Sequence, residues 1–218
     1  MMFVLAVCSA LLAAGGALEC EVCYAINSNT CSGHYEHCKS PRARCTVTLT
    51  EKTLQNDNGE MRSVVLEKSC GSVHSCSHPA TLTTEEFRVR VTTMCCSQNY
   101  CNNGTVSWTA LNSTENGLSC PSCFARNSQT CDVKSHVNCT GAENHCVQYS
   151  ATREGGFTIT VAGCASESME RSNGGIAFRG SSVAVHGMQN KNNGDSVRHN
   201  ALLLSFLSIV TILPIYSQ

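Results

Sequence analysis

The 218-residue sequence lacks a block of basic residues. Its 15 lysines and arginines stand against 16 aspartates and glutamates, which gives a formal net charge of −1. Nucleic-acid-binding surfaces need clustered positive charge, so nothing in the charge pattern indicates a nucleic-acid partner. Prolines number only four, and there is a single tryptophan, Trp108. No long segment has helical periodicity apart from the apolar run at 201–216, so we do not expect a helical fold.

Motifs of enzyme active sites are also missing. The sequence contains no nucleophile elbow, no phosphate-binding glycine loop and no HExxH helix. We therefore expect a protein that is not an enzyme and that uses no cofactor.

The eight histidines are scattered along the sequence. Their densest group mimics a metal site, but solvated histidines beside bridged cysteines are the favoured interpretation. The group consists of Cys70, His74, Cys76 and His78. Four other histidines are expected to be exposed, namely His34, His37, His136 and His145.

Cysteine, in contrast, is abundant, with 17 residues. Cys8 lies in a candidate signal peptide, and the other sixteen are even in number, which allows complete pairing. Secreted chains use cysteines as disulfides, whereas cytosolic chains keep them reduced. Zinc ligation by the Cys-x2-Cys pairs at 20–23 and 120–123 is the alternative. The secretory route and the even count favour disulfides.

The first 17 residues are typical of a signal peptide. A short apolar region precedes Gly15, Gly16 and Ala17, which place small residues at the −3 and −1 positions of a cut after Ala17. The apolar run is short for a membrane span. We expect the mature chain to begin at Leu18.

The apolar tail at 201–218 is typical of a glycosylphosphatidylinositol (GPI) attachment signal. Small and polar residues precede it, and no lysine or arginine follows it to hold a spanning helix in place. Gly194 and Asn192 are the two candidate attachment residues, within a spacer at 186–200. A single spanning helix and a buried core helix are the alternatives. The favoured expectation is an extracellular protein that is anchored to the outer leaflet of the plasma membrane. Shedding from the membrane or secretion is a further expected route to the extracellular space.

An internal repeat divides the rest of the chain. The spacing Cys-x2-Cys-x7-Cys-x6-Cys-x6-Cys begins at Cys20 and recurs from Cys120 with one residue of slip. After the sixth cysteine, the first copy continues to Cys95-Cys96-x4-Cys101-Asn102, whereas the second copy has no cysteine beyond Cys164. The repeat predicts a complete domain at 18–102 and an incomplete one at 118–185.

Residues 103–117 are rich in Asn, Thr, Ser and Gly, which predicts a linker. Asn103 and Asn112 lie in it within N-glycosylation motifs, and Asn138 lies in a third such motif. The secretory context makes all three candidate glycosylation sites.

Short β-branched segments predict strands at 45–50, 63–66, 87–92, 146–149 and 157–161. Asn58-Gly59 and Gly155-Gly156 separate neighbouring segments and favour hairpin turns. The expected fold class is therefore all-β, in small disulfide-rich domains.

The cysteine spacing, with its late Cys-Cys-x4-Cys-Asn, resembles the three-finger domain of the lymphocyte antigen 6 / urokinase receptor family. The resemblance covers 18–102 in full and 118–164 in part. The two tandem copies are most similar to the branch of the gamma-type phospholipase A2 inhibitors and their surface relatives. The resemblance implies that three hairpin fingers project from a disulfide-bonded palm, at 24–37, 46–69 and 77–94 in the first copy. It also implies that Asn102 helps to close the palm.

The resemblance further implies the pairing of the sixteen cysteines. The implied pairs are Cys20–Cys45, Cys23–Cys31, Cys38–Cys70, Cys76–Cys95 and Cys96–Cys101 in the first copy, and Cys120–Cys146, Cys123–Cys131 and Cys139–Cys164 in the second. The second copy lacks both late bridges, so we expect its third finger, around 176–185, to have no covalent closure. We also expect 170–193 to be loosely ordered, and the second copy to act as a partly ordered spacer beneath a stable first domain.

The favoured function is binding of an extracellular or cell-surface protein through the finger faces. Inhibition of a phospholipase A2 by protein–protein binding, and modulation of a ligand-gated receptor, are the alternatives.

Overall fold

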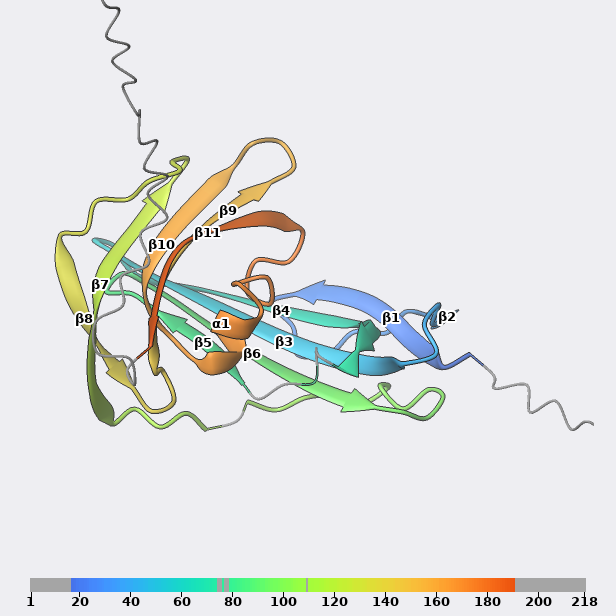
Figure 1. Cartoon of the computed structure of the whole chain (residues 1–218). Coiled ribbons are helices and arrows are strands. Elements are labelled where there is room, and N and C mark those ends of the chain that lie inside the picture. Colours follow the sequence, from blue (N-terminus) through green and yellow to red (C-terminus); the bar gives the residue numbers. More distant parts are fainter. Residues whose placement is uncertain (1–16, 74–75, 77–78, 109, 191–218) are drawn as a thin grey trace, which may run out of the picture.

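The structure is a computed structural model that describes residues 17–73, 76, 79–108 and 110–190 (Figure 1). Several predictions fall outside these residues: nearly all of the signal peptide, the attachment candidates Asn192 and Gly194, and the apolar tail. His74 and His78 also lie outside them. No helix among the described residues is long and apolar enough to cross a membrane.

The first domain is a six-stranded antiparallel array in the order β2-β1-β4-β3-β6-β5. Its strands alternate apolar and polar side chains, as half-buried strands do. Their bounds are β1 (Glu19–Ile26), β2 (His34–His37), β3 (Ala43–Asn56), β4 (Gly59–Ser72), β5 (Ala80–Thr83) and β6 (Phe87–Cys96).

The second domain repeats this order as β8-β7-β10-β9-β11 and has no strand equivalent to β5 among its described residues. A short helix stands between β10 and β11. The bounds are β7 (Glu115–Arg126), β8 (Ser135–Thr140), β9 (His145–Arg153), β10 (Thr158–Ala165), α1 (Glu167–Arg171) and β11 (Ser181–Asn190).

Glycines form the two predicted hairpin turns. In the β3–β4 hairpin Asn56 pairs with Gly59, whose φ is +111°. Gly155 and Gly156 have φ values of +97° and +88° between β9 and β10. A side chain at these positions would strain the backbone, because L residues other than glycine rarely adopt a positive φ.

Eight disulfides tie the strands and loops of the two domains together, and their pairing is the one that the family resemblance implies. Cys20–Cys45 and its counterpart Cys120–Cys146 close loops with sequence separations of 25 and 26 residues. In the chain-entropy account, a bridge of this loop length contributes roughly 3–4 kcal/mol to the free energy of unfolding.

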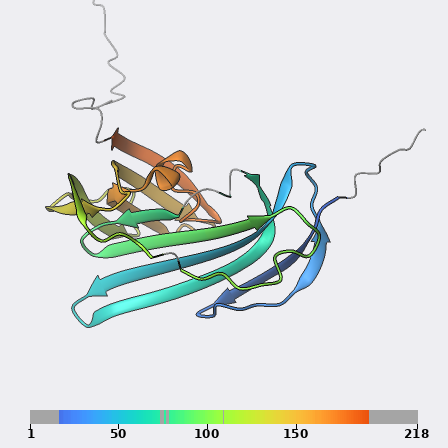
Figure 2. The same ribbon diagram turned by 90° about the horizontal axis from the view of Figure 1, so that it is seen from below.

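The two domains share one sheet and one core. β5 of the first domain pairs with β10 of the second, so that all eleven strands belong to a single sheet (Figures 1 and 2). The largest hydrophobic cluster takes Leu82, Val89 and Val91 from the first domain and Tyr149 and Met169 from the second. The expectation that the second domain is a partly ordered spacer is therefore wrong, because its core is completed by the third finger of the first.

The segment after β10 also differs from the prediction of loose order at 170–193, which is wrong for 170–190. α1 buries Met169 completely, and Gly174 packs on the ring of Tyr149, where an added Cβ would meet ring carbon Cδ2 at 3.0 Å. β11 then pairs with β9 over nine positions. Burial of apolar side chains and strand pairing thus replace the missing disulfides in ordering this segment.

The predicted linker packs against the first domain before β7 begins at Glu115. Val106 is buried against Val47, Leu49 and Leu66. Trp108 stacks on Arg90, whose guanidinium carbon lies 4.0 Å from the ring centroid. The connecting segment 103–114 therefore covers one face of the β3–β4–β6 sheet (Figure 2).

Candidate functional site

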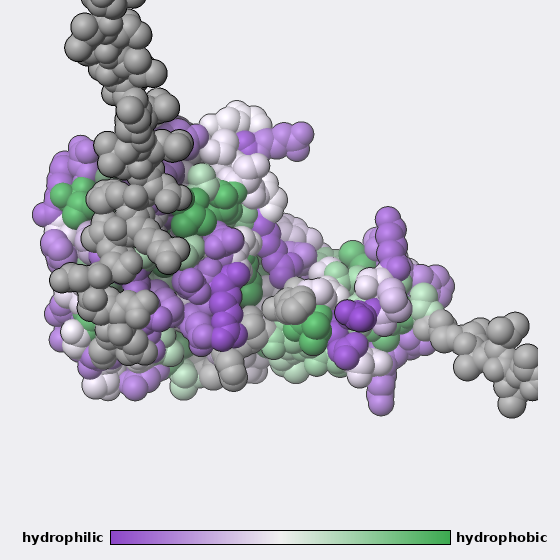
Figure 3. Space-filling view, viewed as in Figure 1, coloured by the Kyte–Doolittle hydropathy of each residue, from purple (hydrophilic) through white to green (hydrophobic). Residues whose placement is uncertain are grey.

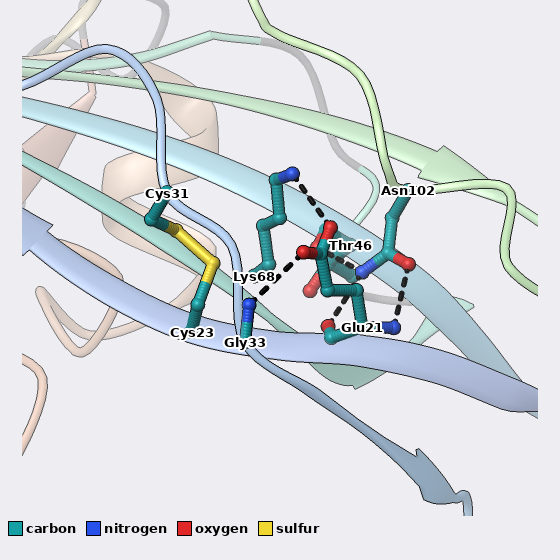
Figure 4. A network of polar contacts seen from close by, with 7 residues as sticks. All are labelled: Glu21, Cys23, Cys31, Gly33, Thr46, Lys68 and Asn102. Carbon is teal, nitrogen blue, oxygen red and sulfur yellow. Dashed lines mark hydrogen bonds and ion pairs between the residues drawn. A yellow bond between two sulfur atoms is a disulfide. The ribbon is translucent and has the colours of Figure 1, made fainter.

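The palm of the first domain is closed by Asn102, which is only 2% exposed (Figure 4). Its Oδ1 accepts a hydrogen bond from the backbone N–H of Glu21 at 2.9 Å, and its Nδ2 donates to the carbonyl oxygens of Glu21 at 2.8 Å and Thr46 at 3.2 Å. One side chain therefore joins the segment that follows the Cys96–Cys101 disulfide to β1 and β3. The role that the resemblance implies for Asn102 agrees with these contacts.

A buried ion pair lies beside Asn102. The Nζ of Lys68 is 2.7 Å from Oε2 of Glu21, and both side chains are less than 7% exposed. Oε1 of the same carboxylate accepts a hydrogen bond from the N–H of Gly33 at 3.1 Å, at the base of the first finger. Buried charges need such partners, because an unpaired one carries a large desolvation cost. The pair fixes the position of the first finger on the palm.

The first finger presents two exposed apolar side chains, Tyr24 at 59% and Ile26 at 61% exposure. Because they are two residues apart on β1, they share one face of the sheet. On β4, Glu67 and Val65 stand directly opposite them. We call the set Tyr24, Ile26, Val65 and Glu67 the finger-one face. The connecting segment covers the other side of the sheet, where Leu66 and Leu49 lie.

The second domain contributes to the same face. Nη1 of Arg179 is 2.8 Å from Oε1 of Glu67, and Nη2 donates to Oγ1 of Thr48 at 3.4 Å. A pocket beside this pair is lined by residues of both domains, including Ser69, Gly71 and Ile176. The second domain thus borders the finger-one face, and Arg179 pairs with the carboxylate of Glu67 in it.

A second exposed aromatic group joins the first finger to the palm. The rings of Tyr35 and Tyr100 meet edge to face with centroids 4.8 Å apart, and each side chain is 45% exposed. The hydroxyl of Tyr100 donates to Oε2 of Glu19, and this hydrogen bond, followed by desolvation, raises the pKa of Tyr100. The two rings offer an aromatic contact surface at this point.

Hydrophobic surface occurs as separate patches within a largely hydrophilic exterior on the face drawn in Figure 3. Protein interfaces combine an apolar centre with a polar rim. The exposed side chains of the finger-one face have this character.

The asparagines of the three glycosylation motifs are accessible. Asn103, Asn112 and Asn138 are all exposed. Nδ2 of Asn138 donates to Oε1 of Glu115 at 3.2 Å, and the backbone of Asn112 lies beside Gly141. None of the three asparagines belongs to the finger-one face.

The predictions about histidines and metals have different outcomes. His34, His37 and His136 are exposed, but His145 is only 8% exposed because β9 places it in the second palm, so its predicted exposure is wrong. Two sets of three cysteine sulfurs come close enough to resemble metal sites, but all six sulfurs are bonded in disulfides. The sets are Cys20, Cys38 and Cys70, and Cys120, Cys139 and Cys164.

Sequence reasoning did not find the polar contacts that shape this region. Glu21 and Lys68 are 47 residues apart, and Glu67 and Arg179 are 112 apart, so no local pattern links them. One signal was present for Tyr24. It follows Cys23, whose side chain is bridged to Cys31, and strand alternation places the next side chain on the opposite face.

Comparison with known proteins places the chain among its relatives. The profile of the u-PAR/Ly-6 domain matches residues 16–104 and 116–190. The chain is 28% identical over 165 residues to phospholipase A2 inhibitor NAI of Notechis ater, covering 72% of this chain and 78% of the inhibitor. It is 30% identical over 165 residues to a gamma-type phospholipase A2 inhibitor chain of Gloydius brevicaudus siniticus, with the same coverage.

A receptor and a solved structure are also similar. The urokinase plasminogen activator surface receptor of Aotus trivirgatus is 27% identical over 157 residues, covering 70% of this chain and 46% of the receptor. The crystal structure of mouse TEX101 matches with a TM-score of 0.34 and 18% identity, covering 79% of this chain and 99% of that one. The sequence relatives are named as inhibitors and a receptor, which suggests a non-enzymatic, protein-binding role at or outside the cell surface.

Proposed function

Because the chain belongs to the u-PAR/Ly-6 domain family, we propose that it is an extracellular binding protein whose finger-one face recognises a protein partner. The carrying observation is that Tyr24 and Ile26 are exposed side by side on a strand held by disulfides and by the Glu21–Lys68 pair. Tyrosine side chains on a rigid support are common anchors of protein interfaces, because little conformational entropy is lost on binding.

The proposal places the protein on the outer leaflet of the plasma membrane. A GPI anchor at Gly194 or Asn192 holds it there, and sugars on Asn103, Asn112 and Asn138 cover surfaces other than the finger-one face. β11 ends at the opposite end of the molecule from the start of β1 (Figures 1 and 2). Attachment shortly after β11 would therefore hold the palm of the first domain away from the membrane.

Inhibition of a phospholipase A2 is the second candidate. It is favoured by the similarity to two phospholipase A2 inhibitors, which extends over both domains of this chain. Such an inhibitor acts by covering a surface of the enzyme, so the same finger-one face serves this function without any catalytic group. The two candidates differ in the partner rather than in the chemistry of binding.

The partner is tested with the full chain, purified from expressing cells. We expect it to bind in a screen of cell-surface receptors, and we expect Tyr24→Ser with Ile26→Ser to weaken that binding at least tenfold. Met94→Ser is the matched control, because Met94 is also exposed on a strand but lies on the opposite face of the sheet. Equal binding by the double variant and the control would overturn the assignment of the face. Potent phospholipase A2 inhibition without receptor binding would select the second candidate.

The anchor is tested by treating expressing cells with phosphatidylinositol-specific phospholipase C. We expect the protein to leave the cell surface and appear in the medium. Retention on the treated cells, while a known GPI-anchored protein is released from the same cells, would contradict the lipid anchor.

A further inference from the structure

β11 of the second domain is equivalent to β6 of the first domain, and β5 covers the outer edge of β6. Cys45 and Cys146 are equivalent in the two copies, so Thr50 of β3 is equivalent to Ala151 of β9. Thr50 pairs with Val91 of β6, and Ala151 pairs with Val183 of β11. Val91 and Val183 therefore occupy equivalent positions. In the first domain, β5 then pairs with β6 over 88–91. In the second domain β11 pairs with β9 alone among the described residues. Among the described residues, the second domain therefore leaves uncovered at 181–183 a strand edge that the first domain covers with β5, and the edge continues uncovered to Val185, as it does in β6 after Val91.

Exposed strand edges invite pairing with another chain, and proteins usually protect them with charge, short length or covering groups. Three other edges of this sheet have such features. β2 is four residues long and carries Glu36, the free half of β4 near its tip carries Glu60 and Arg62, and β8 carries the glycosylation motif of Asn138.

Among the described residues, β11 carries neither charge nor a covering strand on this edge before its β-bulge at His186. It is ten residues long, its sequence SSVAVHGMQN contains no acidic or basic residue other than one histidine, and Val185 is 41% exposed. His186 lies at a β-bulge, where its Nε2 is 2.7 Å from Oγ of Ser150. The regular, uncharged part of the edge is thus 181–185, before the bulge.

We propose that β11 is a self-association edge at which two copies of this chain pair antiparallel about a twofold axis. A second copy is the occupant that the charge pattern fits, because an uncharged strand meets its own image without like-charge repulsion. A twofold interface uses the same surface on both copies, so one strand suffices to build it. The pairing supplies to each β11 the neighbour that β5 gives to β6, and it joins the two eleven-stranded sheets into one.

The valines give this edge its specificity. Val183 and Val185 stand opposite Ala151 and Tyr149 on the core side of the sheet. In the dimer they meet the valines of the second copy as cross-strand pairs, which β-branched side chains favour. A single strand pair buries less than a standard protein interface, so we expect an equilibrium in the micromolar range rather than a permanent dimer.

Sedimentation equilibrium of the full chain in mild detergent tests this proposal. We expect the mass to rise from monomer to dimer with concentration. We expect Val185→Lys to weaken the dimer at least tenfold, because each copy would place a charge in an apolar cross-strand pair. Val73→Lys is the matched control, because Val73 is 51% exposed in the first domain and far from β11 in the sequence. A chain that stays monomeric at every concentration, or a dimer weakened equally by both variants, would overturn the proposal.

Single cysteines give an independent test that leaves the strand uncharged. They are introduced one at a time at Ser182, Val183, Ala184 and Val185, with Val73→Cys as control. Directly opposite residues in an antiparallel pair have Cα atoms about 4.5–5.5 Å apart, within reach of a disulfide. We expect a covalent dimer at one or two of the four positions and none with Val73→Cys. No cross-link in β11, or an equal yield with the control, would contradict the pairing.

Discussion

The two domains have the same strand order but are held together differently. The first domain has five disulfides, a buried Glu21–Lys68 ion pair and the Asn102 contacts. The second domain has three disulfides, and Pro121 and Ala162 stand where Glu21 and Lys68 stand in the first, as the pairing of Ala162 with Cys123 indicates. One domain is closed by its own bonds, whereas the other depends on its neighbour.

The neighbour supplies apolar surface and strand pairing. Met169 and Tyr149 pack in one cluster with Leu82 and Val89 of the first domain. The ring of Phe87 stacks on Phe124 with centroids 4.9 Å apart. Burial, with a smaller contribution from the charge of Glu170, raises the pKa of Tyr149, in agreement with its position inside the core. The comparison indicates that a domain that lacks two bridges can be ordered by a shared core.

The largest predicted effect concerns the internal closure of the first domain. Glu21→Gln leaves the Lys68 ammonium buried without a counter-charge, so we expect a loss of about 3–5 kcal/mol in the free energy of unfolding, measured by urea denaturation. Glu36→Gln removes the exposed partner of His34 and is expected to cost less than about 1 kcal/mol. Similar losses for both variants would contradict the special role of the buried pair.

A double variant sharpens this comparison. Glu21→Leu with Lys68→Leu replaces the ion pair by apolar groups, as the second domain does with Pro121 and Ala162. We expect it to recover most of the stability lost in Glu21→Gln, because no charge is left buried alone.

The shared core gives the next largest effect. Met169→Ala is expected to cost about 3 kcal/mol, because the side chain is fully buried. Trp108 is the only tryptophan and lies against the first domain. Its fluorescence should therefore report the loss although the substitution is in the second domain. Met61→Ala, at a methionine that is 57% exposed, is the control. A Trp108 transition that does not shift would mean that the domains unfold separately.

The strand pairing between the domains is tested at Gly163. A Cβ there would lie 2.2 Å from the carbonyl oxygen of Thr83 in β5, so Gly163→Ala must push the two strands apart. We expect a loss of about 2 kcal/mol in thermal or urea unfolding, and faster proteolysis of the second domain. An added Cβ at Gly104 meets nothing within 4 Å, so Gly104→Ala serves as control. Equal stability of the two variants would argue against the β5–β10 pairing.

The smallest effect is a pH dependence at Lys52. Burial, and secondarily the positive charge of Arg153, lowers the pKa of Lys52 below the ordinary value of 10.5. Between its folded pKa and 10.5 the unfolded chain binds more protons than the folded chain, so stability gains from this group as the pH rises. Lys52→Met should remove this gain. We expect the Tm of the wild type to rise relative to that of Lys52→Met as the pH increases towards 10.5. A difference independent of pH would contradict the shift.

Much of the fold could be predicted because cysteine spacing and strand alternation are local properties. The offset of 100–101 residues between the copies locates both domains, and Asn58-Gly59 locates the tip of the second finger. The ordered state of 170–190 could not be predicted in this way. Its order depends on Met169 and Gly174 meeting surfaces formed elsewhere in the chain.

The candidate site likewise has a part that local sequence predicts and a part that it does not. The bridges and Asn102 follow from a motif, whereas the finger-one face needs Arg179 to reach Glu67 from the second domain.

The sequence by itself therefore determined the class of fold, the number of domains and the asymmetry between them, since each follows from which cysteines are present and at what spacing. Only the tertiary structure decided that the two domains share one core, that Tyr24 and Ile26 stay exposed, and that β11 pairs with β9 alone among the described strands. These features depend on which surfaces meet when strands far apart in the chain come together, and contacts of that kind leave no local pattern.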